Sequence, residues 1–337
     1  MDDPVTLAVQ PGLAPAASLA ADAGALAAAA STLRVYTFAG DVLSLGRYHV
    51  LPSGGGETRV RLHRRHTGGR AVAFGDGFVG IALTLPHRSA LVAAEPLALA
   101  PEQVMNRCVR GILTGLKTAG VAPFYPGRDF ITVNRRPIGV VTFEVVASGA
   151  LLFEAILATE RDFGLTAALL DAVDPAGLVP AEMLTADTMT SLAHLGTRLS
   201  LDDVATLVRR GYEEAFGIRF EAAALPMAAP MDEDRWLRQR ALRPELAHRA
   251  TTRTQLGALE AHVAVEDDTI ADVMLAGDFI ANSPAIAALE DALRRGRAER
   301  PPIEDAVRRV FGQPANFILG VGPVDTVAET IVRALAA

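Results

Sequence analysis

The most informative stretch of the sequence is Arg64-Arg65-His66-Thr67-Gly68-Gly69-Arg70-Ala71-Val72. Before it, Arg59, Arg61 and His63 alternate with apolar residues, which is typical of a half-buried strand. Paired glycines allow the backbone to turn sharply and bring N–H groups close to a ligand. Arginine adds a permanent charge on a planar group that suits phosphate or carboxylate. The stretch therefore predicts a strand that ends in an anion-binding turn; the alternative is an ordinary β-turn between solvated charges.

Composition limits the classes of protein that fit. The chain has 337 residues, of which 50% are hydrophobic, so it can bury a large core and is long enough for two domains. A net charge of −7 argues against a general nucleic-acid-binding protein, whose phosphate contacts need a basic surface. We see no signal peptide and no membrane-spanning segment, since the alanine-rich stretch 13–31 is too weakly hydrophobic. We therefore expect a cytoplasmic protein with no nucleic-acid or membrane partner.

Lysine, cysteine and histidine each restrict the chemistry. Lys117 is the single lysine among 32 lysine and arginine residues, so a reaction that requires lysine has one candidate. The single cysteine, Cys108, excludes an intramolecular disulfide and a cysteine-based zinc site. It falls on the apolar stripe of a predicted helix, where a structural thiol fits better than a reactive one. The seven histidines lack metal-ligand spacing, and we expect no permanent metal.

Periodicity predicts the main elements. An alanine-rich helix is expected over 14–30, a helix from Pro101 that ends before Gly120, and another after a Ser200 capping box. Gly40-Asp41 between two short β-like runs predicts a hairpin over 34–46. Three β-rich runs between 130 and 157 suggest an antiparallel meander. Prolines and charges over 226–253 interrupt the apolar pattern, so we place the domain boundary there: a domain over 1–228, a linker over 229–252 and a small domain over 253–337.

Taken in order, several segments resemble the lipoate-protein ligase branch of the biotin/lipoate ligase superfamily. The most specific is Arg-Arg-x-Thr-Gly-Gly at 64–69, and the resemblance spans nearly the whole chain. It implies an α+β fold with a mixed, largely antiparallel sheet flanked by helices, followed by a small C-terminal α/β accessory domain. The other matching segments are Ser18-Leu19-Ala20-Ala21-Asp22, Leu43-Ser44-Leu45-Gly46-Arg47, Gly127-Arg128-Asp129, the helix 200–216 and Ala276-Gly277-Asp278-Phe279.

The resemblance also implies an activity. Members of the family use ATP and Mg²⁺ to convert lipoate, or octanoate, into an acyl-adenylate. They then transfer the acyl group to a lysine of a lipoyl carrier domain, in a 2-oxoacid dehydrogenase acyltransferase subunit or a glycine cleavage H-like protein. The implied ligand is therefore lipoate or lipoyl-AMP, with ATP and magnesium as co-substrates.

Particular residues take on roles by the same resemblance. Asp129 matches the acidic residue that helps to hold the adenylate and its magnesium, so it is a candidate for transient metal binding. Arg136 falls where the family carries its catalytic lysine, three residues before Gly139. The residues expected to line the acyl-adenylate or its rim are Arg47, Arg65, Thr67, Gly68, Gly69, Arg70 and Ala71.

The lysine motif is degenerate, and this leaves two hypotheses open. Arginine carries the charge of lysine on a larger, differently shaped group, and Pro137 next to it lacks a backbone donor. Loss of one preorganised donor costs about 100- to 1000-fold in rate. The chain is accordingly either a ligase-like acyltransferase or a lipoyl-binding or assembly protein that has lost catalysis. A shared fold with a different ligand is a further alternative, because fold does not fix function.

Overall fold

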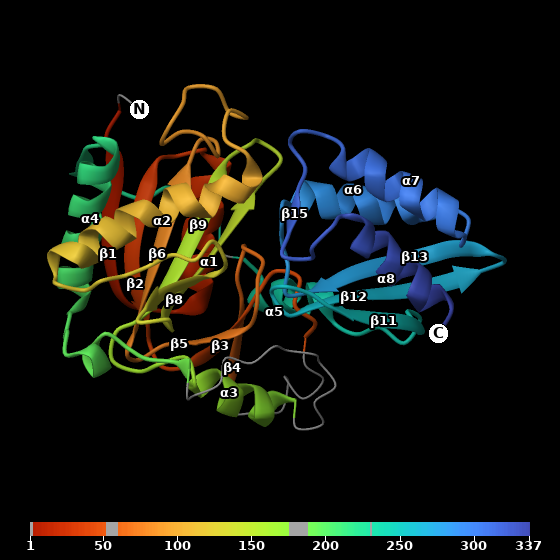
Figure 1. Cartoon of the computed structure of the whole chain (residues 1–337), viewed down its shortest axis with the longest axis horizontal. Coiled ribbons are helices and arrows are strands. Elements are labelled where there is room, and N and C mark those ends of the chain that lie inside the picture. The colour runs from red at the N-terminus through yellow and green to blue at the C-terminus, as the bar shows by residue number, and fades with distance from the viewer. Residues whose placement is uncertain (1–2, 52–59, 175–187, 230) are drawn as a thin grey trace.

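The computed structural model describes residues 3–51, 60–174, 188–229 and 231–337. It contains a larger part built on a seven-stranded sheet and a smaller C-terminal part built on a three-stranded sheet, side by side (Figure 1). This is the predicted α+β fold with a small accessory domain. The assignment of 1–228, 229–252 and 253–337 as domain, linker and domain stays a prediction.

The seven-stranded sheet has the order β10-β1-β2-β6-β9-β8-β7. Strand β1 pairs in parallel with β10 and β2, and the remaining neighbours are antiparallel, so the sheet is mixed but largely antiparallel as predicted. The predicted meander is confirmed as β7, β8 and β9. The strands are β1 (Val5–Leu13), β2 (Thr32–Phe38), β6 (Phe78–Leu85), β7 (Phe130–Val133), β8 (Arg136–Val145), β9 (Leu151–Ala158) and β10 (Phe220–Ala222).

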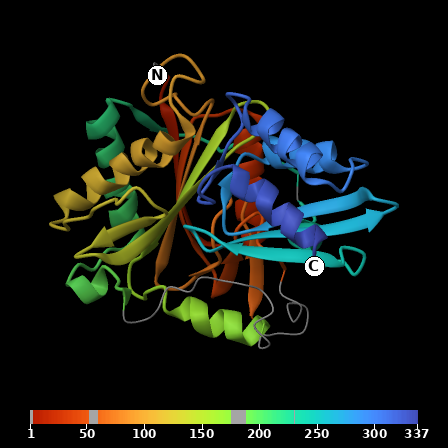
Figure 2. The same cartoon turned by 45° about the vertical axis from the view of Figure 1, so that its right-hand side comes forward.

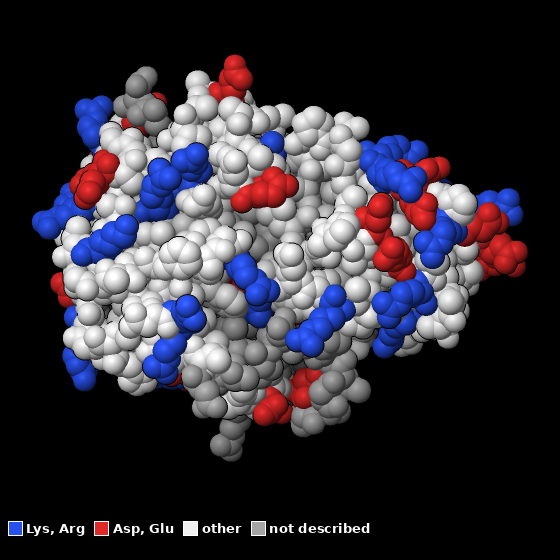
Figure 3. Space-filling view, viewed as in Figure 1, with Lys and Arg blue, Asp and Glu red and all other residues white. Residues whose placement is uncertain are grey.

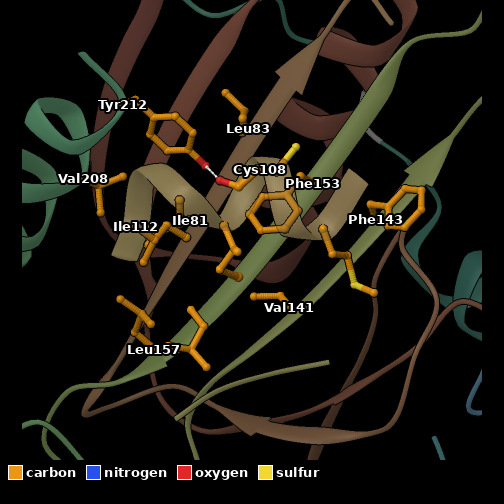
Figure 4. Packing of buried hydrophobic residues seen from close by; sticks show 14 of the residues in the cluster. Ile81, Leu83, Cys108, Ile112, Val141, Phe143, Phe153, Leu157, Val208 and Tyr212 are labelled. Atoms are coloured by element: carbon orange, nitrogen blue, oxygen red, sulfur yellow. Dashed lines mark hydrogen bonds between the residues drawn. The ribbon is translucent and has the colours of Figure 1, made fainter. Parts of the chain in front are cut away.

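Two helices cover one face of this sheet, α2 (Pro101–Thr118) and α4 (Leu201–Phe216). Ser200 and Asp203 form the predicted capping box at the start of α4. The Tyr212 hydroxyl of α4 donates a hydrogen bond to the carbonyl of Cys108 in α2, at 2.6 Å (Figure 4). Cys108 is buried in this core, and burial raises the pKa of its thiol to about 12, which confirms the prediction of a structural thiol.

Helix α1 (Pro15–Ala27) and a second, three-stranded sheet lie on the other face. That sheet has the order β4-β3-β5, and α3 packs beside it (Figure 2). The hairpin predicted over 34–46 is wrong, because β2 and β3 belong to different sheets. Leu43 and Leu45 pack in a separate small core, which draws β3 away from β2. The bounds are β3 (Val42–Leu45), β4 (Arg61–Arg64), β5 (Val72–Phe74) and α3 (Leu165–Val173).

The arginine-rich strand is more deeply buried than its sequence suggests. Arg61 is exposed, but His63 and Arg64 are both buried, so the prediction of a half-buried strand is wrong for its second half. The physical reason is that α5 (Glu233–Leu237) folds over the end of β4, where Arg64 Nε donates to the Leu237 carbonyl. Arg59 lies outside the described residues.

The smaller part is an antiparallel sheet, β11-β12-β13, packed against three helices. Part of the stretch predicted as a linker is ordered, since α5, the 3₁₀ turn η3 (Arg238–Arg240) and the start of β11 fall within it. Prolines lie within two residues of the start of all three helices: Pro284 in α6, Pro301 and Pro302 in α7, and Pro323 before α8. The elements are β11 (His248–Arg253), β12 (Ala258–Glu266), β13 (Thr269–Gly277), β14 (Ile280–Ala281), α6 (Ser283–Leu293), α7 (Arg300–Phe311), β15 (Ile318–Leu319) and α8 (Asp325–Leu335).

The two parts share their cores. Phe317 of the smaller part stacks on Phe143 of β8 at 5.0 Å, within the larger core. Tyr48 of the larger part stacks on Phe279 at 4.7 Å, within the smaller core. The interface between them is therefore apolar and interlocked rather than a loose contact.

The visible surface carries no large region of one charge. Blue and red side chains are interspersed over both parts in Figure 3. Among the described residues, no helix combines the length and the apolar character needed to cross a bilayer.

Candidate functional site

The predicted anion-binding stretch forms a loop between β4 and β5, and Arg65 lies inside it. Its guanidinium makes four hydrogen bonds, with Nη1 donating to the backbone and hydroxyl oxygens of Ser44 and Nη2 to the carbonyls of Gly68 and Arg70. The side chain is 3% exposed. Arg65 therefore holds the loop in its turned shape and fastens it to β3.

Beneath the loop, polar residues form a row across the large sheet. Strand pairing places Arg34, Ala82, Glu154 and Thr142 opposite one another on β2, β6, β9 and β8, on the face turned toward the loop. The Thr67 hydroxyl donates to Glu154 Oε2 at 2.5 Å. The Thr142 hydroxyl donates to the Gly68 carbonyl at 3.0 Å. The loop is thus bound to the middle of the sheet by side chains from two strands.

The row continues to α1 through Arg34. Its Nη2 donates to Asp22 at 2.5 Å and to the Ser18 hydroxyl at 3.1 Å, all in the interior. Burial raises the pKa of Glu154, and the nearby Asp22 raises it further, whereas Arg65 and the bond from Thr67 lower it. Burial also raises the pKa of Asp22, against the opposing effect of Arg34. Two buried carboxyl groups therefore share one network with the loop.

The positive charge of the site comes from arginine rather than histidine. Burial lowers the pKa of His66 to about 4 and that of His63 to about 3, so both are neutral at pH 7. Burial and neighbouring arginines lower the pKa of Arg64 to about 9, which leaves it charged at pH 7. An anion would consequently interact with fixed guanidinium groups.

Arg70 and Asp129 form a buried ion pair at one side of the loop. Nε donates to Oδ2 at 2.6 Å and Nη2 to Oδ1 at 3.3 Å, and the guanidinium lies 4.7 Å from the centre of the Phe130 ring. Both carboxylate oxygens of Asp129 are thus used. The described residues contain no group of three His, Cys, Asp or Glu that could hold a metal. Magnesium could reach Asp129 only if this pair opened.

The paired glycines lie against the smaller part of the molecule. Gly69, with φ +84°, donates its N–H to the Phe279 carbonyl at 2.8 Å. A Cβ on Gly68 would be 2.4 Å from the same carbonyl oxygen, and one on Gly46 would be 1.9 Å from the Gly69 carbonyl oxygen. Only glycine fits at these points of close backbone approach. The sequence predicted that N–H groups of the paired glycines would bind an anion. In this structure the Gly69 N–H is instead bonded to the Phe279 carbonyl.

Trp236 of α5 covers the outer side of the loop. Its indole Nε1 donates to the Arg64 carbonyl at 2.9 Å, and its ring lies 4.8 Å from that of His66. The Arg47 guanidinium is 4.9 Å from the Trp236 ring, and Nη1 reaches the His66 carbonyl at 3.5 Å. Arg47 is half-buried and therefore lies at the rim of the site.

Arg136 lies apart from these residues. It is exposed and follows a tight turn in which Asn134 and Arg135 have φ of +49° and +66°. A bulge pairs Arg136 with Val133, a residue of the core beneath α2 and α4, and pairs Pro137 with Thr132. Paired residues share a face, so Arg136 projects on the side of the sheet away from the loop. That Arg136 takes the role of the family lysine stays a prediction.

The structure therefore brings most, but not all, of the predicted residues together. Arg65, Thr67, Gly68, Gly69, Arg70 and Asp129 cluster in the interior, with Arg47 at the rim. Ala71 is buried in the small core with Leu43 and Leu45. The roles predicted for these residues in ligand binding remain to be tested.

Sequence reasoning gave no role to Arg34, Glu154 or Trp236. A charged residue inside an apolar strand was the available signal, since Arg34 stands between Leu33 and Val35 and Glu154 between Phe153 and Ala155. Such residues are rarely buried without a partner. Trp236 lay in the predicted linker, where no pattern indicated that it would pack on the loop.

Comparisons with known proteins agree with the fold described above. Residues 243–315 match the model of the bacterial lipoate protein ligase C-terminus. The whole chain resembles P. falciparum LipL1 solved in complex with lipoate, with a TM-score of 0.70 and 13% identity over 98% of this chain and 100% of LipL1. The C-terminal part of the chain therefore matches a lipoate protein ligase domain, and the chain as a whole has the fold of LipL1.

Two further structures of the lipoate-protein ligase family match the chain. One is a lipoate-protein ligase A bound with ATP, and the other is the T. acidophilum protein Ta0514, a putative lipoate protein ligase with bound lipoic acid. Each gives a TM-score of 0.50 and 17% identity over 71% of this chain and 94% of its own. No curated protein matches by sequence. At these identities the structural likeness concerns the fold.

Proposed function

We propose that this chain is a cytoplasmic acyltransferase that activates lipoate or octanoate with ATP and attaches it to a lysine of a lipoyl carrier domain. The observation that carries the proposal is the buried loop in which Thr67, Gly68 and Gly69 turn over the sheet between Arg65 and Arg70. The resemblance of the whole chain to LipL1 in complex with lipoate supports the same ligand class.

In the proposed reaction, the acyl carboxylate attacks the α-phosphate of ATP, which yields the acyl-adenylate and pyrophosphate. The amine of the carrier lysine then attacks the acyl carbonyl, and AMP leaves. Arg65, Arg70 and Arg47 would offset the negative charge of the adenylate, since preorganised donors stabilise developing charge best in a site that excludes water. Asp129 would orient Arg70 through its two hydrogen bonds, or bind Mg²⁺ if the pair opens.

Binding at this loop requires a local rearrangement. The N–H of Gly69 is bonded to the Phe279 carbonyl, so an adenylate that uses this donor must displace the Phe279 peptide. The carrier would be a 2-oxoacid dehydrogenase acyltransferase subunit or a glycine cleavage H-like protein, as the family resemblance implies.

The position of Arg136 favours a second candidate, a lipoyl-binding or assembly protein without catalysis. Arg136 is exposed and on the face of the sheet away from the loop. Lys117, the only lysine in the sequence, is exposed on α2, which covers that same distant face. The site thus keeps its arginines but has no lysine within it.

Mass spectrometry of a carrier domain separates the two candidates. The full chain is incubated with the carrier, ATP, Mg²⁺ and either lipoate or octanoate. An ATP-dependent mass increase of one acyl group on the carrier lysine supports the acyltransferase. If calorimetry detects lipoate binding but no donor modifies the carrier, the non-catalytic candidate holds. Absence of both binding and transfer contradicts both candidates.

A further inference from the structure

His49 and Asp278 face each other in the interior, where the two parts of the molecule meet. Asp278 lies in the turn between β13 and β14, and His49 lies in the turn after β3. Asp278 Oδ1 is 3.7 Å from His49 Nε2, and both side chains are 1% exposed. Neither of these two atoms has a hydrogen-bond partner among the described residues. The proposed reaction uses neither residue.

Backbone hydrogen bonds join the two parts on both sides of Asp278. The Gly277 N–H donates to the Tyr48 carbonyl at 2.9 Å, and the Phe279 carbonyl accepts from the Gly69 N–H at 2.8 Å. The residues before and after Asp278 thus hold the smaller part against the larger one. A change in the Asp278 side chain therefore acts on both bonds, including the one that occupies the Gly69 N–H.

The orientation of the Asp278 carboxyl group is fixed. Its Oδ2 accepts a hydrogen bond from the Ala258 N–H at 3.0 Å, and the Asp278 N–H donates to the Ala258 carbonyl at 2.8 Å. The carboxyl group fits there because residue 257 is glycine, where a Cβ would be 2.2 Å from Oδ2. With Oδ2 held by Ala258, Oδ1 stays opposite His49 Nε2.

The tautomer of His49 is fixed as well. Its Nδ1 is 2.9 Å from the Val50 carbonyl oxygen, which can only accept, so Nδ1 carries a proton. The neutral ring therefore turns the lone pair of Nε2 toward Asp278 Oδ1. Two acceptors that face each other in the interior without a donor are unfavourable. A single proton between them turns the contact into an O–H···N hydrogen bond.

The surroundings of His49 keep its ring neutral. Burial lowers its pKa to about 4, and the charges of Arg64 and Arg65 lower it as well. The bond to the Val50 carbonyl and the charge of Glu260 act in the opposite direction. The proton between the two side chains consequently belongs to the carboxyl group.

The surroundings of Asp278 favour its protonated form. Burial raises its pKa from 3.8 to about 7, and the carboxyl groups of Glu260 and Asp129 raise it as well. The bond from the Ala258 N–H and the charge of Arg70 oppose this rise. The carboxyl group therefore keeps its proton in mildly acid solution and loses it above neutral pH.

We propose that His49 and Asp278 share one buried proton, carried by Asp278, and that this proton fastens the turn at 276–279 to the larger part. When the proton leaves to solvent, a buried carboxylate faces the Nε2 lone pair, and the turn moves away so that the carboxylate reaches water. This movement frees the Gly69 N–H from the Phe279 carbonyl. The pair is thus a proton-dependent latch on the glycine loop.

The direction of the pH dependence follows from the two states of Asp278. With the turn in place its pKa is about 7, and in water it returns toward 3.8, so the docked turn binds the proton more tightly. Docking is strongest at low pH and weakens by about tenfold per pH unit up to about pH 7. Above that pH, both states are ionised and the dependence ends.

Hydrogen exchange of the Gly69 amide in the ligand-free full chain measures the latch. Each rate is divided by the intrinsic exchange rate at the same pH, which gives a protection factor. We expect this factor to fall about tenfold or more between pH 5 and 8. The Leu192 amide, which bonds to the Ala158 carbonyl within the larger part, should keep a constant factor.

D278N reproduces the protonated carboxyl group at every pH. Its side-chain NH₂ can donate to His49 Nε2 while its oxygen accepts from the Ala258 N–H. Protection of the Gly69 amide in D278N should therefore be equal at pH 5 and pH 8. The matched control is E144Q, which removes another buried carboxyl group of the interface, whose pKa is about 7, and leaves the pair intact. E144Q should keep the fall in Gly69 protection.

Nuclear magnetic resonance of the parent gives a second measurement, which decides the proposal even if D278N folds poorly. The Asp278 carboxyl carbon should titrate near pH 7. The ring nitrogens of His49 should show a proton on Nδ1 alone between pH 5 and 8.

The consequence for ligand binding rests on the proposed function. If an adenylate uses the Gly69 N–H, the parent should bind lipoyl-AMP at least tenfold more tightly than D278N at pH 8, and about equally at pH 5. The comparison at one pH cancels the titration of the ligand itself. If neither protein binds lipoyl-AMP, the proposed function fails, while the ligand-free measurements still decide the latch.

Three results would overturn the shared proton. These are titration of the Asp278 carboxyl carbon below pH 5, a proton on His49 Nε2 at pH 6, and a protection factor of the Gly69 amide that is constant from pH 5 to 8 in the parent. An equal fall in the parent and in D278N would show that another group causes the pH dependence, and it would also overturn the proposal.

Discussion

Glu144 and Ser283 join the two parts of the molecule, with Glu144 Oε1 accepting a hydrogen bond from the Ser283 N–H at 2.7 Å. Glu144 belongs to β8, and Ser283 is the first residue of α6. The carboxyl group is fully buried, and burial raises its pKa from 4.5 to about 7, although Arg47 and the bond from Ser283 oppose the rise. The bond between the two parts therefore includes a group that titrates near neutral pH.

This pKa predicts a pH-dependent effect of E144Q. The folded protein binds the proton of Glu144 more tightly than the unfolded chain does, so Glu144 makes the parent lose stability as the pH rises from about 4.5 to 7. Gln keeps the acceptor oxygen without titrating. We expect E144Q to match the parent near pH 4.5 and to exceed it by up to about 3 kcal/mol at pH 8, in urea unfolding.

The control for E144Q is E102Q, at an exposed residue on α2. Its difference from the parent should stay constant between pH 4.5 and 8. A constant difference for E144Q as well would contradict the raised pKa of Glu144.

Close packing between Gly68 and Phe279 gives a second prediction. A Cβ at position 68 would be 2.4 Å from the Phe279 carbonyl oxygen, so G68A must push the two parts away from each other. Overpacking of this kind costs about 1–3 kcal/mol. We expect lower stability together with faster hydrogen exchange of the Gly69 amide, which bonds to that carbonyl.

G149A is the matched variant for G68A. Gly149 has φ +89° but nothing within 4 Å of its added Cβ, so alanine there introduces backbone strain without a clash. Its stability should fall by about 1 kcal/mol with no change at the Gly69 amide. If exchange at Gly69 is the same in G68A and G149A, the contact with Phe279 does not hold the loop.

Substitution of Arg70 should lower the stability of the protein strongly, whereas substitution of Arg136 should barely change it. R70Q leaves Asp129 buried without its partner, which costs about 3–5 kcal/mol, and D129N in the same chain should restore part of this loss. R136A removes an exposed side chain on the distant face, so stability should change by less than about 0.5 kcal/mol. Denaturant unfolding measures both.

Acyl transfer by R136A decides whether Arg136 replaces the family lysine. From its position we expect carrier modification within about twofold of the parent, if the parent is active. A loss of 100-fold or more, the usual cost of one preorganised donor, would place Arg136 in the reaction and contradict the orientation described for it.

Local patterns predicted the elements well but not how they meet. The Ser200 capping box and the meander of β7 to β9 depend on neighbouring residues, so the sequence alone identified both. The separation of β2 and β3 into two sheets depends on which core receives Leu43, and no local pattern shows that.

For the candidate site, too, the sequence predicted local features but not the contacts between distant segments. The residues of the loop could be named because they adjoin one another in sequence, and a family resemblance supported them. The link from Thr67 to Glu154 depends on strand register and spans 87 positions. The bulge that turns Arg136 away from the loop is a matter of register as well, since a shift of one residue reverses the face.

Trp236 provides a direct signal for events at the loop. It is the only tryptophan in the chain, and its ring lies 4.9 Å from the Arg47 guanidinium and 4.8 Å from the His66 ring. A ligand that binds Arg47 or displaces the loop must alter this environment. We therefore expect lipoate or ATP to change Trp236 emission over the same concentration range in which calorimetry detects binding.

W236F tests the assignment of that signal. It should lose the emission change and, because the bond from the indole to the Arg64 carbonyl is absent, about 1 kcal/mol of stability. Free tryptophan titrated with ATP corrects for absorption by the nucleotide. If calorimetry shows saturation while Trp236 emission in the parent stays constant, the ligand binds away from the loop that Trp236 covers, and the predicted site is wrong.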